Sequence, residues 1–350
     1  MSTMTRPNTV PNPVANPVPN PRLVRYHAPT GLSTLFRPLP KQPGARPVLD
    51  VSYRPASGGP TLRFSAREAL GIPEQTLLFV LLELAQEESQ RSPESCHIGA
   101  TSTEVTGRQL WSLLNPGAAG AEGETIHLQT SWFELNRRCN VSTGGSSQAL
   151  RQAQLKRLCE VIVWEVEPDA RRTTRQSYLV AWLVGDEERL HLALNVRLAG
   201  AILGGRYVSV SLAERLHLGA DTTMALHAFL STVLRPGHGF NVGLETLAER
   251  LWPGSSSSAP LGTQRRRRKV VRDSLNAIGG LQSWGVQWVS PNVAHVVRHA
   301  PKAARVRETT IPRLNASKPS SYREQPTPEN APYINAIEPF DVSGLFTTKP

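Results

Sequence analysis

Cysteine is scarce in this chain, and its few cysteines are far apart. Cys96, Cys139 and Cys159 are the only thiols among 350 residues. A disulfide framework needs many paired cysteines, and a structural zinc site needs closely spaced ligand pairs. We therefore expect reduced, buried thiols, with neither a disulfide framework nor a zinc site.

Long hydrophobic runs are also missing. The best run, Leu77 to Leu82, ends at Glu83, far short of the roughly 18 apolar residues that a membrane span requires. This run predicts a buried helix. The N-terminal residues carry Asn-Pro repeats where a secretory signal needs an apolar core. We expect a cytoplasmic protein with no membrane partner.

The motifs of nucleotide-hydrolysing and metal-dependent enzymes are absent from the sequence. There is no Gly-x-x-x-x-Gly-Lys-Ser/Thr loop, and no His-x-His with a nearby tyrosine nucleophile stands out. His295 and His299 have the spacing of a helical zinc pair, but no Glu follows His295 and the segment is strand-like. Gly204-Gly205 and Gly279-Gly280 follow predicted helices and fit helix C-caps better than phosphate loops. We expect no catalytic residues, no cofactor and no bound metal.

Positive charge is what the chain has in excess. Lys and Arg number 39 against 28 Asp and Glu, which gives a formal net charge of +11. Such an excess favours a polyanionic partner and says nothing about fold. Nucleic acid is the first candidate, and an anionic membrane surface is the second.

Proline gathers at both ends of the chain. Residues 1–47 hold eleven prolines and residues 301–350 hold eight, with no periodic apolar face in either segment. Such segments cannot bury enough apolar surface to fold. We predict disordered tails at 1–47 and 301–350, and an α+β body divided into domains at 48–194 and 195–300.

Each predicted domain contains a helix-turn-helix followed by a strand pair, the arrangement of a winged helix. The first domain is expected to contain a hairpin over 48–64, helices over 73–86, 131–138 and 147–159, and a wing formed by strands at 161–166 and 177–182. The second is expected to contain helices over 222–234, 244–251 and 263–278, a Ser-rich turn at 255–258, and strands at 286–289 and 293–297. The sequence thus predicts two tandem winged-helix domains.

The helix over 263–278 has a basic face opposite an apolar one. Its basic face falls within an arc of about 100° on a helical wheel. Arginine can bind guanine O6 and N7 with two hydrogen bonds in the major groove. The residues expected to contact DNA are Arg265, Arg266, Arg268, Lys269, Arg272 and Asn276. The alternative is a solvated charge run or a flexible loop that grips only phosphates.

The helix over 147–159 and the loop of the first wing supply weaker candidates. Glutamine suits adenine, although this helix could instead be structural or position phosphates, because Arg151 projects among its leucines. The loop arginines could reach phosphate or the minor groove, or could belong to a solvated hairpin tip. These candidates are Gln148, Gln152, Lys156, Arg157, Arg171, Arg172 and Arg175.

Scattered stretches, in one consistent order over residues 48–300, resemble the replication protein C family of iteron-binding initiators from IncQ-type plasmids. The matching stretches in the first half are Leu49-Asp50-Val51-Ser52-Tyr53, Phe64-Ser65, Leu70-Gly71, Gly107-Arg108-Gln109-Leu110, Leu158, Val161 and Leu194-Asn195. Those in the second half are Gly204-Gly205, Leu226-His227, Leu247, Leu251-Trp252-Pro253, Arg265 through Arg268, Val271-Arg272 and Leu275. Both Pro-rich tails depart from the family's shorter pattern.

The resemblance implies an initiator that binds directly repeated origin DNA, helps to open adjacent A·T-rich DNA and recruits a plasmid helicase and primase. It places the recognition helix at residues 264–272, with a homodimer as a further possibility. A winged-helix transcriptional regulator of a plasmid operon is the alternative function, because it would need the same helices. A scaffold that uses winged helices for protein contacts would instead show little salt-sensitive DNA affinity.

Overall fold

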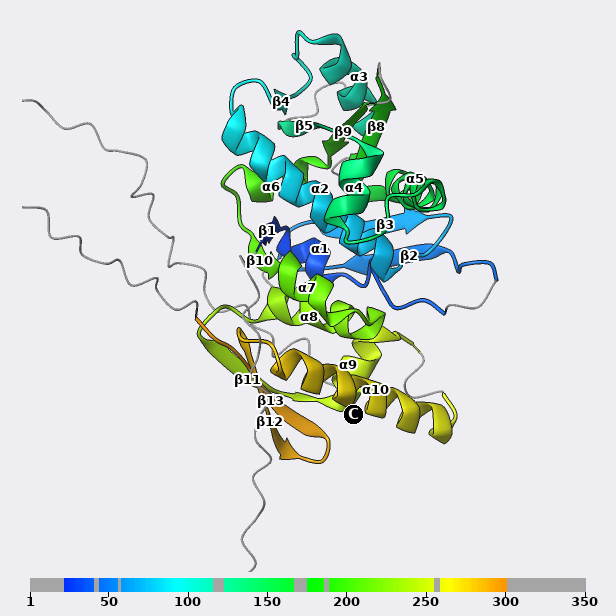
Figure 1. The fold of residues 1–350 in the computed structure, drawn as a ribbon, viewed down its shortest axis with the longest axis vertical. Coiled ribbons are helices and arrows are strands. Elements are labelled where there is room, and N and C mark those ends of the chain that lie inside the picture. The colour runs from blue at the N-terminus through cyan, green and yellow to red at the C-terminus, as the bar shows by residue number, and fades with distance from the viewer. Residues whose placement is uncertain are drawn as a thin grey trace, which may run out of the picture. The chain divides into compact units, whose positions relative to one another are not determined.

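The computed structural model describes residues 22–40, 44–55, 58–115, 123–166, 175–185, 189–254 and 259–300. The predicted tail at 301–350 and the first part of the other predicted tail, residues 1–21, lie outside the described residues. Helices and antiparallel sheets are mixed along the chain (Figure 1). The expected α+β class is confirmed.

The first part of the chain alternates between helices and the strands of three small sheets. Its helices are α1 (Ala28–Leu32), α2 (Ile72–Arg91), α3 (Val105–Leu114), α4 (Trp132–Arg138), α5 (Gly145–Cys159) and α6 (Val196–Ile202). Its strands are β1 (Leu23–Tyr26), β2 (Leu49–Tyr53), β3 (Thr61–Ala66), β4 (His97–Ile98), β5 (Thr125–Thr130), β6 (Ile162–Val166), β7 (Arg175–Tyr178), β8 (Val180–Val184) and β9 (Leu190–Leu194).

The second part has longer helices and one three-stranded sheet. Its helices are α7 (Leu212–Leu218), α8 (Asp221–Val233), α9 (Leu244–Leu251) and α10 (Leu261–Gly279). Its strands are β10 (Val208–Ser211), β11 (His238–Gly243), β12 (Trp284–Ser290) and β13 (Val293–Arg298). The helices and strands predicted between 222 and 297 all form, with ends shifted by a few residues, and β11 is an addition that the sequence pattern did not predict.

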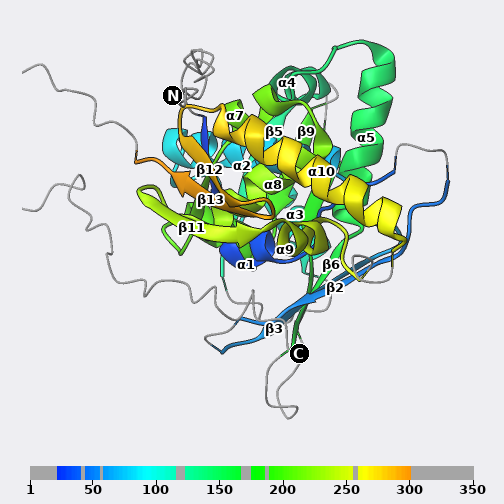
Figure 2. The same ribbon diagram turned by 90° about the horizontal axis from the view of Figure 1, so that it is seen from below.

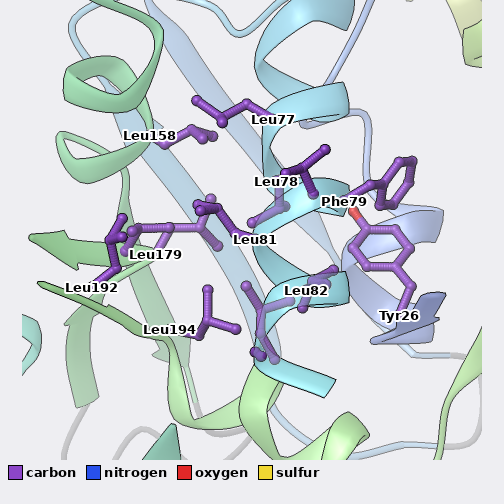
Figure 3. Close-up of a cluster of buried hydrophobic side chains, with 14 of the residues drawn as sticks. Tyr26, Leu77, Leu78, Phe79, Leu81, Leu82, Leu158, Leu179, Leu192 and Leu194 are labelled. Carbon is purple, nitrogen blue, oxygen red and sulfur yellow. The ribbon is translucent and has the colours of Figure 1, made fainter. Parts of the chain in front are cut away.

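Helix α2 is the centre of the main core. Pro73 lies in its first turn, where a missing N–H costs nothing, and the run Leu77 to Leu82 is buried on all sides. A helix that is apolar all round must be enclosed by other elements. Figure 3 shows Leu158, Leu179 and Leu192 meeting α2 from one side and Tyr26 from the other. The predicted buried helix over 73–86 is confirmed.

The expected hairpin over 48–64 forms, but the predicted first wing is divided between two sheets. Strands β6 and β7 pair with each other and extend the β2–β3 hairpin in the order β2-β3-β6-β7. Strand β8 belongs instead to a sheet with the order β4-β5-β9-β8. The predicted strand over 177–182 therefore breaks at Leu179, a buried residue of the main core. Local alternation cannot reveal such a change of partner, because both halves have strand-like sequences.

The prediction of disorder over 1–47 is wrong for residues 22–36. Strand β1 pairs with β10 in antiparallel register, and Val24 and Tyr26 are fully buried. Arg250 from α9 donates a hydrogen bond to the Gly31 carbonyl at 3.0 Å. The composition of this segment is that of a disordered tail, but a few apolar residues suffice to order it when their partners are supplied from distant parts of the chain. We call residues 22–36 the N-terminal strap.

Tyr26 in the strap offers a test of this packing. Its ring meets Phe79 edge to face, with centroids 5.0 Å apart, but no described residue gives its buried hydroxyl a hydrogen-bond partner. Burying an unsatisfied hydroxyl costs roughly 1–3 kcal/mol. We expect Tyr26→Phe to raise the free energy of unfolding, by about 1 kcal/mol after relaxation, in urea denaturation. A loss of stability would show that the hydroxyl has a partner.

The main core also contains residues from beyond position 194. Leu198, Leu212 and Ala228 belong to the same cluster of buried side chains as the leucines of α2. The boundary between two domains at 194/195 therefore stays a prediction. Helix α8 contacts both α10 and α1, so the strap lies against a helix that supports α10.

Candidate nucleic-acid interface

Helix α10 has a cationic face that is exposed and an opposite, apolar face that packs against the rest of the protein. Val271, Leu275 and Ile278 are fully buried, and the Ser274 hydroxyl accepts a hydrogen bond from Thr223 of α8 at 3.0 Å. Helix α9 lies against α10 (Figure 2), and its Leu247 and Leu251 are buried. The exposed face includes Arg265, Arg266, Lys269, Arg272 and Asn276, together with Asp273 and Ala277. The structure therefore brings five of the six predicted residues of this helix together on one exposed surface.

Two other cations of α10 are held by neighbouring side chains. Arg268, the sixth predicted residue, forms an ion pair with Glu245 of α9 and is half-buried. Arg267, which the helical wheel places on the apolar side, lies over the Trp252 ring at 5.2 Å. These contacts orient the start of α10 against α9. Arg265 and Arg266 are therefore the exposed cations closest to the N-terminus of α10.

Trp288 ties the β12–β13 hairpin to this helix. Its ring lies 5.2 Å from the Arg272 guanidinium, and its Nε1 donates to the Asn276 Oδ1 at 3.0 Å. Arg272 also donates to the carbonyl of Pro291 in the hairpin turn. Sequence reasoning missed Trp288. A large aromatic residue three positions before a Pro-Asn turn, on the solvent side of a strand, was the signal that could have identified it.

We expect Trp288→Ala to weaken DNA binding without unfolding the chain. Arg272 and Asn276 would lose their fixed positions, and ordering a side chain on binding costs about 0.5–1.5 kcal/mol. The expected loss is roughly three- to tenfold in affinity, measured by fluorescence anisotropy. Trp288→Phe is the matched control, because it retains the ring over Arg272 but not the hydrogen bond. Equal affinities for all three proteins would contradict this coupling.

Helix α5 presents a different surface. Gln148, Gln152 and Lys156 are exposed, as predicted, and Leu150 is 57% exposed although the helical wheel places it on the apolar side. Arg151 takes the buried position instead, because Asn136 and Gln154 accept hydrogen bonds from its guanidinium. Satisfied polar groups can replace an apolar contact inside a protein. The helical wheel therefore misplaces Leu150.

Arg157 does not fit its predicted role in DNA binding. Its Nε and Nη2 donate to one oxygen of Glu74, at 2.8 and 2.7 Å, and Glu74 is fully buried at the start of α2. The Glu74 carboxylate also accepts from the Gly71 N–H and from Arg46. A buried ion pair of this kind holds its members in place. The structure assigns Arg157 to the anchor that joins α5 to α2.

The remaining predicted cations belong to the connection between β6 and β7. Arg171 and Arg172 lie outside the described residues. Arg175 is exposed, and its backbone lies opposite that of Glu165 in the antiparallel register of β6 and β7. This hairpin belongs to the four-stranded sheet rather than to the sheet of β8 and β9. Its role in DNA binding stays a prediction.

Two further arginines, Arg215 and Arg298, are buried, and a third, Arg250, is partly buried. Arg215 donates to the Met224 carbonyl at 2.7 Å, and Arg298 donates to the Ser209 carbonyl at 2.7 Å. Burial lowers the pKa of Arg215 to about 9 and that of Arg250 to about 10, and it also lowers the pKa of Arg298. The pKa values of Arg215 and Arg250 remain well above neutral pH, so both guanidinium groups are charged there. They hold the junctions of helices and strands by donating to backbone carbonyls.

The described part of the chain shows no group of three His, Cys, Asp or Glu side chains that could hold a metal ion. Within the strand pair, the His295 ring is hydrogen-bonded to Asn241 at 2.7 Å. None of the helices in the described ranges is long and apolar enough to cross a bilayer.

Comparison with known proteins gives one family match. A family model described as Replication protein C (RepC) matches residues 24–298. Two crystal structures of domains 2 and 3 of RctB also match, each with 8% identity over 75% of this chain. A selenomethionine derivative is covered over 95% of its length with a TM-score of 0.44, and a second structure over 93% with a TM-score of 0.43. No curated protein matches the chain.

Proposed function

The chain belongs to the replication protein C (RepC) family, since the family model covers residues 24–298, and from this premise we propose that it is a plasmid replication initiator. In this proposal it binds directly repeated origin sequences as duplex DNA, through two winged-helix units. It promotes opening of adjacent A·T-rich DNA and recruits a plasmid helicase and primase. It is not itself an enzyme.

The repeated order of elements supports the two winged-helix units. Helix α8 is followed by β11, α9, α10 and the β12–β13 hairpin, with the sheet order β11-β13-β12. After α2 come β5, α4, α5 and the β8–β9 hairpin, with β5-β9-β8 in the same relative order; β4 and α3 lie between α2 and β5, and β6 and β7 lie between α5 and β8. Here the wing of the first unit is β8–β9. A winged helix places its last helix before the wing in the major groove, so in this proposal α5 and α10 are the two readers.

The cationic face of α10 is the single observation that carries the proposal. Its apolar side is fixed by α8 and α9, and its outer side presents Arg265, Arg266 and Lys269. A rigid helix with guanidinium groups near its N-terminus fits recognition of base edges in the major groove. The excess of 39 Lys and Arg over 28 Asp and Glu adds general attraction to phosphate.

Binding to the direct repeats of the encoding replicon tests this function. The purified full chain is titrated against a repeat-containing duplex and a shuffled duplex of equal length, at one physiological salt concentration and then over a salt series. We expect repeat-dependent affinity at least about 1000-fold above that for shuffled DNA. Equal, weak binding to both would contradict an initiator, and an absence of salt-sensitive binding would favour the scaffold.

Origin opening separates an initiator from a transcriptional regulator. Unpaired thymines are mapped with permanganate on supercoiled origin DNA, with and without the chain and its accessory factors. We expect reactive thymines next to the repeats when the chain is present. Tight binding that never exposes unpaired bases would leave a repeat-binding regulator as the better function.

A further inference from the structure

The two reader helices differ in the side chains that they leave exposed. On α5 the first exposed turns carry Gln148, Ala149, Leu150 and Gln152, followed by Lys156. On α10 the corresponding turns carry Arg265, Arg266 and Lys269. The sequence by itself hides this difference, because both helices contain several basic residues.

The structure removes both arginines of α5 from its outer surface. Arg151 is 4% exposed, and its guanidinium is held by Asn136 and Gln154, which are themselves buried. Arg157 is bound to the fully buried carboxylate of Glu74. Turning either side chain outward would leave buried polar groups without partners, which is strongly unfavourable. Helix α5 therefore has no guanidinium for a base.

No hydrogen bond or ion pair from another described residue engages the guanidinium groups of Arg265 and Arg266. The side chains of α10 that are engaged, Arg267 and Arg268, contact Trp252 and Glu245 on the α9 side. The exposed arginines lie in the second turn of the helix, the part that approaches base edges when a recognition helix enters the groove. Helix α10 therefore has guanidinium groups available for bases.

These surfaces match different base pairs. Arginine and lysine pair with O6 and N7 of guanine, glutamine pairs with N6 and N7 of adenine, and aliphatic groups contact the thymine methyl. We propose that the two readers divide the recognition site, with α5 selecting A·T pairs through Gln148, Leu150 and Gln152, and α10 selecting G·C pairs through Arg265 and Arg266. This inference rests on the proposed function, and it adds the base composition that each unit recognises.

Two features of α5 support an A·T reader. Leu150 is 57% exposed, which leaves an aliphatic side chain in water unless a partner such as a thymine methyl covers it. Lys156 is two turns beyond Gln148, and the residues that read bases are those nearest the N-terminus of a recognition helix. At that distance Lys156 suits a phosphate contact, which carries no sequence information.

In vitro selection from a randomised duplex library tests the division with the full chain. The wild-type protein is expected to enrich an A·T block and a G·C block whose centres lie about one or more helical turns, 10–10.5 base pairs each, apart. The variant Gln148→Ala/Leu150→Ala/Gln152→Ala should lose the A·T block and keep the G·C block. Arg265→Ala/Arg266→Ala should do the reverse. Each change should lower affinity for the wild-type consensus at least about tenfold.

A matched control and a gain-of-function variant sharpen this test. Gln109 and Leu113 are exposed on α3, so Gln109→Ala/Leu113→Ala makes the same two kinds of substitution, one of each, away from the readers and should leave the consensus unchanged. Gln152→Arg should convert one A·T position to G·C.

The possible outcomes separate this inference from the proposed function. If the α5 variant alters G·C positions, or weakens binding to all sequences equally, the division is overturned while repeat binding stands. If the wild-type chain enriches no sequence, the proposed function fails and the division fails with it. Loss of the A·T block alone, with folding confirmed by circular dichroism, supports the division.

Discussion

Replacing Arg265, Arg266 and Lys269 by alanine is expected to weaken specific DNA binding and to remove its selection of G·C pairs. Each guanidinium that reads a guanine contributes about 1–3 kcal/mol of discrimination, and 1.4 kcal/mol corresponds to a factor of ten. The two arginines together predict a loss of at least roughly 30-fold in affinity for the repeat, measured by anisotropy at fixed salt. Affinity for shuffled DNA should fall much less, so the ratio of specific to nonspecific affinity should fall while the selection of A·T pairs by α5 remains.

The matched control removes the same charge from surfaces outside the readers. Arg91, Arg108 and Arg206 are exposed at the end of α2, on α3 and before β10, and their replacement by alanine changes the net charge by the same amount. This variant should lower affinity for both DNAs slightly and keep the specificity ratio. The slope of log affinity against log salt should fall by about 0.9 for each phosphate that the variant no longer neutralises. Equal reductions in affinity for the two triple variants would refute base reading by α10 and leave only general electrostatic attraction.

Glu74→Ala is expected to produce the largest loss of stability. The carboxylate is fully buried and accepts hydrogen bonds from the Gly71 N–H at 2.8 Å, from Arg46 at 3.0 Å and from Arg157. Its removal would leave the Arg157 guanidinium, whose side chain is 17% exposed, with only the more distant Glu68 carboxylate at 4.0 Å. Removing one member of a buried ion pair costs about 3–5 kcal/mol. The measurement is the free energy of unfolding from urea denaturation followed by circular dichroism.

Glu88→Ala is the appropriate comparison for Glu74. Glu88 forms a pair with Arg91 at 2.9 Å on the surface of the same helix, and exposed pairs contribute about 0–1 kcal/mol. We expect the two changes to differ by at least about 2 kcal/mol. A small effect of Glu74→Ala would mean that solvent reaches Arg157, and that Arg157 is available to DNA as the sequence predicted.

The N-terminal strap has a consequence for how the readers are held. Its strand β1 pairs with β10, and its Tyr26 packs against Phe79 of α2. Arg250 of α9 donates a hydrogen bond to its Gly31 carbonyl. The strap therefore contacts both α2, which begins the first of the proposed winged-helix units, and the helices that support α10. Close packing of this kind restricts relative movement of the elements that it joins.

Local sequence determined most of the elements and the composition of the main candidate surface. The helix over 263–278 could be predicted because its apolar positions recur at helical spacing, and its cationic face follows from the same periodicity. The β2–β3 hairpin and α2 are equally local, since a turn signal and a continuous apolar run are sufficient to indicate them. The family could be recognised because matching stretches occur in one order from Leu49 to Leu275, and the family model confirms it.

Tertiary structure decided which residues have partners. The strap is buried because β10, far along the chain, supplies its pairing, and no property of residues 22–36 alone reveals this. The predicted strand over 177–182 divides at Leu179 because its halves find different neighbours. In the sequence, Arg151 and Arg157 look like Arg265, because each is an arginine on a predicted DNA-reading helix. In the fold, however, Asn136 and Gln154 bind Arg151, and Glu74 binds Arg157. Side-chain chemistry is local, whereas availability to a ligand depends on long-range contacts, and these form only when the whole chain folds.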